Sequence, residues 1–91
     1  MAIDDQSAEA ALLDIRGFAK VNRFEFRRHA LERMQQRGVY AWDVHFALCN
    51  ATGCVYQPEN RRWKVAGPDL DGDELMLAVE IDDGLLVVTV F

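Results

Sequence analysis

Three basic side chains stand at equal spacing in one segment of the chain: His29, Arg33 and Arg37. Positions four apart differ by only about 40° around a helix, so a helix would carry all three in one slanting row. Imidazole is the side chain that most readily moves protons near neutral pH. Guanidinium groups bind phosphate through paired hydrogen bonds. The row therefore predicts an anion site that is also able to transfer a proton.

These are the groups that a metal-independent ribonuclease needs. A base takes the proton from the ribose 2′-hydroxyl, and cations stabilise the negative charge that builds on the phosphorane. One His and two Arg at this spacing also occur on solvated helix faces, where they pair with acids such as Glu25 and Glu32. Spacing alone favours the solvated face, so the functional interpretation depends on the features that follow.

The charge of the chain is unevenly distributed. The formal net charge of −5 argues against nucleic-acid binding over the whole surface. Residues 16–37, however, hold seven Lys or Arg and two Glu, a local net charge of +5. A basic segment in an acidic chain indicates a localised anion-binding surface. We predict that Arg27, Arg28 and Arg62 contribute to binding phosphate or RNA.

Hydrophobic periodicity places the basic row on the second of three expected helices, over residues 7–19, 28–37 and 41–50. Gly38 suits the left-handed position that ends the second helix. A period-two pattern then predicts four strands, over residues 54–57, 61–67, 74–81 and 85–91. Residues 24–27 also alternate, so they form a short strand or an extended entry to the second helix.

Helices followed by strands predict an α+β protein, with N-terminal helices packed on a four-stranded antiparallel sheet. Ninety-one residues suit a single domain. We divide it into an N-terminal helical extension, residues 1–22, and an α+β core, residues 24–91. The last strand is apolar on both faces, so we expect it to lie centrally in the sheet.

The remaining metal-ligating side chains form incomplete patterns. His45 and Cys49 are one helical turn apart and Cys54 follows, but a structural zinc site normally has a fourth ligand. The loop over residues 69–74 is rich in Asp, yet it lacks the spacing and flanking helices of a calcium loop. We therefore predict no metal and no cofactor, and we expect both cysteines to be buried thiols.

Three large aromatic residues, Trp42, Tyr56 and Trp63, have ring faces that can stack on nucleic-acid bases. In a chain of this size such side chains more often fill the core. We expect them in the core.

The sequence also predicts a cellular location for the chain. Its first five residues include two aspartates and no basic residue, unlike the basic start of a secretory signal, and no apolar run is long enough to span a bilayer. We expect a cytoplasmic protein with no membrane partner and with reduced cysteines.

Residues 29–39 resemble the signature of a family of small bacterial proteins, the domain of unknown function 4258 family. The signature is His-Ala-x-x-Arg-Met-x-x-Arg-Gly followed by an aliphatic residue, and the chain meets every fixed position. Three more family features occur in order: Asp43-Val44, Trp63-Lys64-Val65-Ala66-Gly67 and Val88-Thr89-Val90-Phe91. The resemblance covers roughly residues 24–91.

Members of this family are similar to toxins of the RelE and barnase-like superfamily, and some are encoded beside zinc-finger antitoxins. The resemblance implies a RelE/barnase-like fold, metal-independent endoribonuclease activity on RNA, and a cognate antitoxin as partner. It implies that His29 is the acid–base group and that Arg33 and Arg37 bind the scissile phosphate. It further implies that Lys64 supplies a cation from the sheet and that Thr89 supplies a hydroxyl in the same cleft.

Two features depart from the RelE pattern, in which toxins are usually strongly basic: the acidic total charge and the extra N-terminal helix. They favour a second hypothesis, a non-catalytic protein- or anion-binding module with a toxin-like fold. Such a module would dock a partner, or form a homodimer, through the basic helix and the apolar last strand. A toxin fold that has lost activity and kept the anion site is a third alternative.

Overall fold

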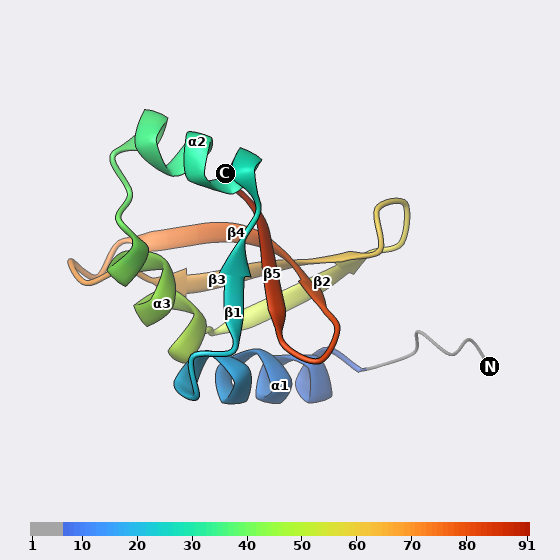
Figure 1. The fold of residues 1–91 in the computed structure, drawn as a ribbon. Helices are drawn as coiled ribbons and strands as arrows, with labels where there is room; N and C mark the ends of the chain where they lie inside the picture. Colours follow the sequence, from blue (N-terminus) through green and yellow to red (C-terminus); the bar gives the residue numbers. More distant parts are fainter. Residues whose placement is uncertain (1–6) are drawn as a thin grey trace.

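The computed structural model describes residues 7–91, so the first six residues of the predicted N-terminal extension lie outside the described residues. Residues 7–91 form three helices and five strands (Figure 1). In chain order these are α1 (Ala8–Lys20), β1 (Phe24–Phe26), α2 (Arg28–Arg37), α3 (Ala41–Cys49), β2 (Gly53–Gln57), β3 (Arg62–Pro68), β4 (Glu74–Ile81) and β5 (Leu85–Val90). The predicted helices and the four predicted strands are confirmed to within one residue at each end. None of these helices has the length and apolar character needed to cross a membrane.

The strands of residues 7–91 form one mixed sheet in the order β1-β5-β4-β3-β2. The α+β class and the antiparallel arrangement of β2 to β5 are confirmed. The prediction of a four-stranded antiparallel sheet is wrong because β1 adds a fifth strand, parallel to β5, with Phe24 opposite Leu85 and Phe26 opposite Val87. The alternation in β1 is only three residues long, and a local pattern carries no information about so distant a partner. Strand β5 lies between β1 and β4, as expected for an apolar strand.

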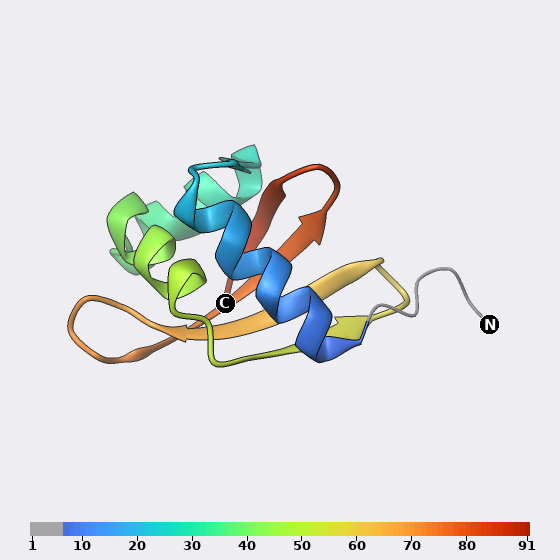
Figure 2. The ribbon, with the colours of Figure 1, turned by 90° about the horizontal axis from the view of Figure 1, so that it is seen from below.

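Helices α1 and α3 cover one face of the sheet (Figures 1 and 2). Alternate strand residues point to opposite faces, and in β3 Trp63 and Val65 are buried on the helix side. Arg62 and Lys64 therefore lie on the other side, called the open face below. The largest fully buried side chains of the core come from all layers: Ile15, Val44, Leu48, Val65, Leu77, Val79, Val87 and Val90.

Helix α1 is packed into this core although it lies outside the family-like segment. The Ser7 hydroxyl caps its first turn by accepting a hydrogen bond from the Ala10 N–H at 3.1 Å. Farther along, Arg16 donates to the carbonyl of Ala51 with both Nε (2.9 Å) and Nη2 (2.7 Å). The guanidinium thereby fixes α1 to the connection between α3 and β2.

Helix α2 continues directly from β1 and packs along β5 through its buried residues Ala30 and Met34. It ends at Gly38, whose φ of 67° confirms the predicted left-handed cap. The Val39 N–H then donates to the Met34 carbonyl at 2.9 Å, which satisfies a carbonyl of the last turn. This packing places Arg33 of α2 beside the C-terminal end of β5, where its Nε donates to the Val90 carbonyl.

Candidate functional site

The basic row of α2 is extended rather than convergent. His29 is in the first turn of the helix and Arg37 in the last. A rise of 1.5 Å per residue separates them by about 12 Å along the axis. Arg33 stands between them, and its Nε donates to the Val90 carbonyl at 3.3 Å while Nη1 donates to Gln36 Oε1 at 3.3 Å. One phosphate group therefore cannot contact both ends of the row.

The sheet brings Lys64 and Thr89 onto the same face. Lys64 of β3 lies opposite Ala78 of β4, and Ala78 lies opposite Thr89 of β5. Residues directly opposite one another share a face, so the three form one row across the open face. Neighbouring strands are about 4.8 Å apart, which sets the Lys64 and Thr89 backbones about 10 Å apart. The side chain between them is the methyl group of Ala78, which is buried.

Three of the predicted site residues are each linked to the last residues of the chain, at the end of β5. Arg33 contacts the carbonyl of Val90. The Lys64 amine lies 5.1 Å from the centre of the Phe91 ring. Thr89 is the residue before Val90 and belongs to the Lys64 row. We call Arg33, Lys64 and Thr89 the β5-end cluster.

Arg27 and Arg62 are also brought together, and they share one acid. Glu80 pairs through Oε1 with Arg27 Nη2 and through Oε2 with Arg62 Nε, both at 3.4 Å. Arg62 lies opposite Glu80 on the open face, and Arg27 follows β1. The two guanidinium groups are partly exposed, so their charges remain accessible while Glu80 offsets one of them.

The start of α2 holds two of the predicted residues in different settings. Arg28 is almost fully exposed and pairs with Glu32, one turn later, at 3.5 Å. Such an exposed pair contributes little to stability and matches a solvated helix face. His29 is exposed as well, and within residues 7–91 its ring makes no hydrogen bond or ion pair. It lies one turn before Arg33 on the same flank, where an imidazole is free to exchange a proton with a ligand.

Arg37 lies in a different place from the β5-end cluster. It lines a cavity of about 390 Å³ between the α2–α3 corner and the β3–β4 loop, together with Tyr40, Trp42 and Asp71. The Tyr40 and Trp42 rings stack at 4.7 Å with an angle of 17° between their planes. The structure therefore does not place Arg37 beside the other predicted phosphate ligands.

The expectation that all three large aromatics fill the core is wrong for Trp42, which is 60% exposed. It is confirmed for Trp63, which is buried, and Tyr56 packs partly buried against the Trp63 ring at 5.1 Å. Trp42 is in the first turn of α3, on the side away from the buried Val44 and Leu48. A helix position that faces the solvent overrides the usual preference of the residue type.

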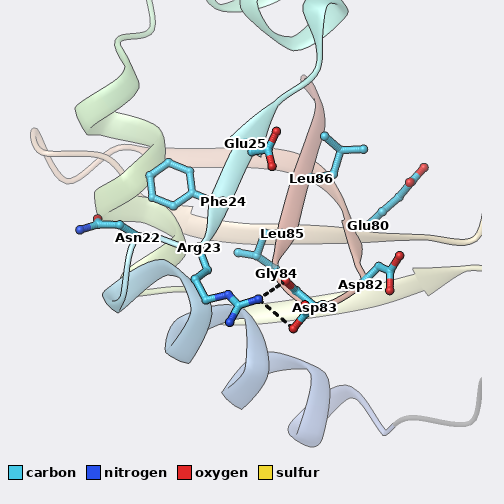
Figure 3. A pocket seen from close by; sticks show the side chains of 10 residues that line it. All are labelled: Asn22, Arg23, Phe24, Glu25, Glu80, Asp82, Asp83, Gly84, Leu85 and Leu86. Atoms are coloured by element: carbon cyan, nitrogen blue, oxygen red, sulfur yellow. Dashed lines mark hydrogen bonds and ion pairs between the residues drawn. The ribbon is translucent and has the colours of Figure 1, made fainter.

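Figure 3 shows a cavity of about 490 Å³ beside the turn between β4 and β5. Four of its ten lining residues carry carboxylates: Glu25, Glu80, Asp82 and Asp83. The Arg23 guanidinium also lies at this cavity. Its Nη2 pairs with Asp83 Oδ1 at 2.8 Å and donates to the Asp83 carbonyl at 2.7 Å. The sequence showed this turn only as a hairpin signal. None of the predicted catalytic residues lines the cavity, and its charge opposes phosphate binding.

The side chains considered as metal ligands are used by the fold. His45 Nε2 donates to the Ala19 carbonyl at 2.9 Å, and the ring stacks on Phe24 at 5.0 Å. Burial raises the pKa of the Cys49 thiol, and nearby Lys20 opposes this shift. Burial likewise raises the pKa of the Cys54 thiol. Within residues 7–91 no group of three His, Cys, Asp or Glu side chains is arranged to hold a metal ion.

Comparison of the chain with protein-family models, with curated proteins and with solved structures gives no match. The functional argument therefore rests on the geometry of the residues themselves.

Proposed function

We propose that this chain is a metal-independent endoribonuclease of the RelE/barnase-like class, with its active site at the β5-end cluster. The observation that supports the proposal is that Arg33 contacts Val90, Lys64 contacts Phe91 and Thr89 belongs to β5, so residues far apart in the sequence are each linked to the same strand end. Two cations and a hydroxyl near one strand end suit a phosphodiester. His29, one turn from Arg33, supplies the proton-transfer group.

Arg33 suits a phosphate-binding role because the fold holds its side chain in place and leaves some of its N–H donors unused. A guanidinium has five N–H donors, and the contacts with Val90 and Gln36 use two of them. The other three donors are left for phosphate oxygens. A side chain already fixed by the protein loses less conformational entropy on binding, which favours both affinity and orientation.

In the proposed reaction, His29 takes the proton from a ribose 2′-hydroxyl and the 2′-oxygen attacks the adjacent phosphorus. Arg33 and Lys64 stabilise the additional negative charge of the phosphorane. The bond from phosphorus to the 5′-oxygen then breaks, and the protonated imidazole returns its proton to that oxygen. The products are a 2′,3′-cyclic phosphate and a free 5′-hydroxyl, so no metal and no external reactant are required.

The proposal also covers the family of the chain, its partner protein, its cellular location and its further contacts with RNA. A chain with the His29 signature fits the domain of unknown function 4258 family, and a toxin of this kind would have a cognate antitoxin in the bacterial cytoplasm. Arg27 and Arg62 would bind RNA phosphates outside the scissile position. Arg37 would contact a more distant nucleotide, because about 12 Å of helix separates it from His29.

The test is cleavage of a single-stranded RNA by the purified chain in the presence of excess EDTA. We expect cleavage to continue and to leave cyclic phosphate ends, while a 2′-O-methyl version of the same RNA stays intact. Lys64→Ala, purified in parallel, should cleave more slowly, which excludes a contaminating nuclease. Loss of cleavage in EDTA, or cleavage of the 2′-O-methyl strand, would contradict the mechanism.

A non-catalytic anion- or protein-binding module is the second candidate. Two observations favour it: Glu80 offsets the charge of Arg27 and Arg62, and the carboxylates of the cavity in Figure 3 lie next to that pair. Docking through the edge of the last strand is not available to this module, because β5 is paired on both sides. Binding of RNA without cleavage would support this candidate.

Glu80 offers a test of whether the open face binds RNA. Glu80→Gln removes the acid that pairs with Arg27 and Arg62, so we expect tighter RNA binding and a salt dependence steeper by about one phosphate contact. Binding is measured by fluorescence anisotropy over a range of salt concentrations. Glu59→Gln, in the exposed β2–β3 turn, is the matched control and should leave the slope unchanged. Equal affinities for Glu80→Gln and the original chain would place the RNA elsewhere.

A further inference from the structure

Helix α1 carries small or apolar residues on two opposite sides. The inner side packs three fully buried residues into the core: Ala11, Ile15 and Ala19. The outer side, called the outer stripe below, carries four at three- and four-residue spacing: Ala10, Leu13, Gly17 and Val21. Leu13 is 66% exposed and Val21 is 63% exposed. A surface helix normally presents polar residues on its outer side, so the outer stripe has the composition of a helix that is covered on both sides.

Gly17 stands in the middle of the outer stripe, and the fold of one chain does not require a glycine there. A Cβ built on Gly17 meets no atom within 4 Å, and its backbone is helical. Glycine inside a helix is less favourable than alanine. Gly17 lines a cavity of about 340 Å³ together with Leu13, Phe18 and Val21. Figure 2 shows α1 on the near side of the molecule with no other described element over it.

We propose that a second copy of this chain covers the outer stripe, through an antiparallel pair of α1 helices related by a two-fold axis near Ile15. Positions 13 and 17 are equally distant from position 15. Each Leu13 therefore enters the hollow at Gly17 of the other copy, and one axis satisfies both contacts. An interface in which each copy offers the same patch is the usual form of a homodimer.

The charges along α1 fit the same axis. Glu9 and Lys20 are exposed, and neither forms an ion pair within residues 7–91. They differ by only about 20° around the helix, so they lie on one flank of the outer stripe. Their midpoint falls between positions 14 and 15, which brings Glu9 of each copy opposite Lys20 of the other. The interface thus gains two ion pairs from charges that have no ion-pair partner within residues 7–91 of one chain.

We expect the affinity between the two copies to be low. One pair of short helices buries less surface than a standard stable interface. We therefore expect dissociation in the micromolar range, and the association is separate from the proposed ribonuclease activity.

The test is sedimentation velocity of the full chain from about 1 to 500 µM, a range that brackets a weak interface. The original chain should shift from monomer to dimer, and Leu13→Ala should weaken the dimer at least about tenfold. Val55→Ala is the matched control, because Val55 is also 66% exposed but lies on β2. It should leave the dissociation constant unchanged. A chain that stays monomeric at 500 µM, or a dimer insensitive to Leu13→Ala, would overturn the proposal.

Two further variants separate the interface from an effect on folding. Gly17→Ala should raise the melting temperature of the monomer by a few degrees, because alanine favours the helix, and should weaken the dimer, because its methyl group fills the hollow. Glu9→Lys and Lys20→Glu should each weaken the dimer, whereas the double variant should restore it by exchanging the charges. Failure of the double variant to restore the dimer would exclude the proposed axis.

Discussion

Replacing Gly67 with alanine is expected to destabilise the fold by about 3 kcal/mol or more, enough to remove much of the stability of a small domain. Gly67 is buried in β3 under helix α3. An added Cβ would overlap the carbonyl oxygen of Ala47 and lie 2.9 Å from its carbonyl carbon and 3.2 Å from its Cα. These are backbone atoms, so no side-chain rotation relieves the overlap and α3 has to move away from the sheet.

Urea unfolding followed by circular dichroism measures this effect. Gly53→Ala is the matched control, because Gly53 is also in a strand of the same sheet and a Cβ there meets nothing within 4 Å. We expect Gly53→Ala to change the free energy of unfolding by less than about 1 kcal/mol. Similar unfolding midpoints for the two variants would contradict the close approach of β3 and α3.

The second large effect concerns RNA cleavage. If His29 transfers the proton, His29→Ala should slow cleavage by about 100- to 10,000-fold. The ring is exposed and makes no hydrogen bond or ion pair within residues 7–91, so the free energy of unfolding should stay the same. RNA affinity should change little, since phosphate binding depends on the cations. Single-turnover cleavage of an end-labelled RNA, compared with its binding isotherm, separates the two quantities.

Gln35→Ala is the control for this variant because Gln35 is an exposed polar residue of α2 on the other flank of the helix. It should cleave RNA at the original rate. Cleavage by His29→Ala at the rate of Gln35→Ala would remove the imidazole from the mechanism and leave Arg33 and Lys64 as binding groups. The non-catalytic module would then become the better description of the chain.

Local patterns were sufficient to predict most of the fold. The helices have clear apolar stripes and a glycine cap at Gly38, and β2 to β5 follow one another through short turns, so neighbours in sequence are neighbours in the sheet. The pairing of β1 with β5 joins segments from opposite ends of the described chain, and three alternating residues do not specify such a partner. Gly67 illustrates the same limit. Its position in the Trp63–Gly67 motif is visible in the sequence, but the reason for the glycine is the backbone of α3.

The candidate site was predictable in its parts rather than in its arrangement. The basic segment and the helical spacing select Arg33, and the family resemblance selects Lys64 and Thr89, but only the register across β4 brings Lys64 and Thr89 onto one row. The helical spacing that selected Arg37 also moves it away from His29, because a row just over two turns long is longer than a phosphate. The exposure of Trp42 was not predictable from residue type, since it depends on which side of α3 meets the sheet.

The position of β5 has a consequence for how the protein folds. Its pairing with β1 closes a loop of about sixty residues, and long-range pairings of this kind slow folding because the chain entropy is lost before the contact forms. The three helices can fluctuate into place locally, but the sheet is divided until β5 enters between β1 and β4. The residues that surround the end of β5 acquire their geometry in that same step. If the β5-end cluster binds phosphate as proposed, this ability should therefore arise in one late, cooperative event, and a partly folded chain should lack it.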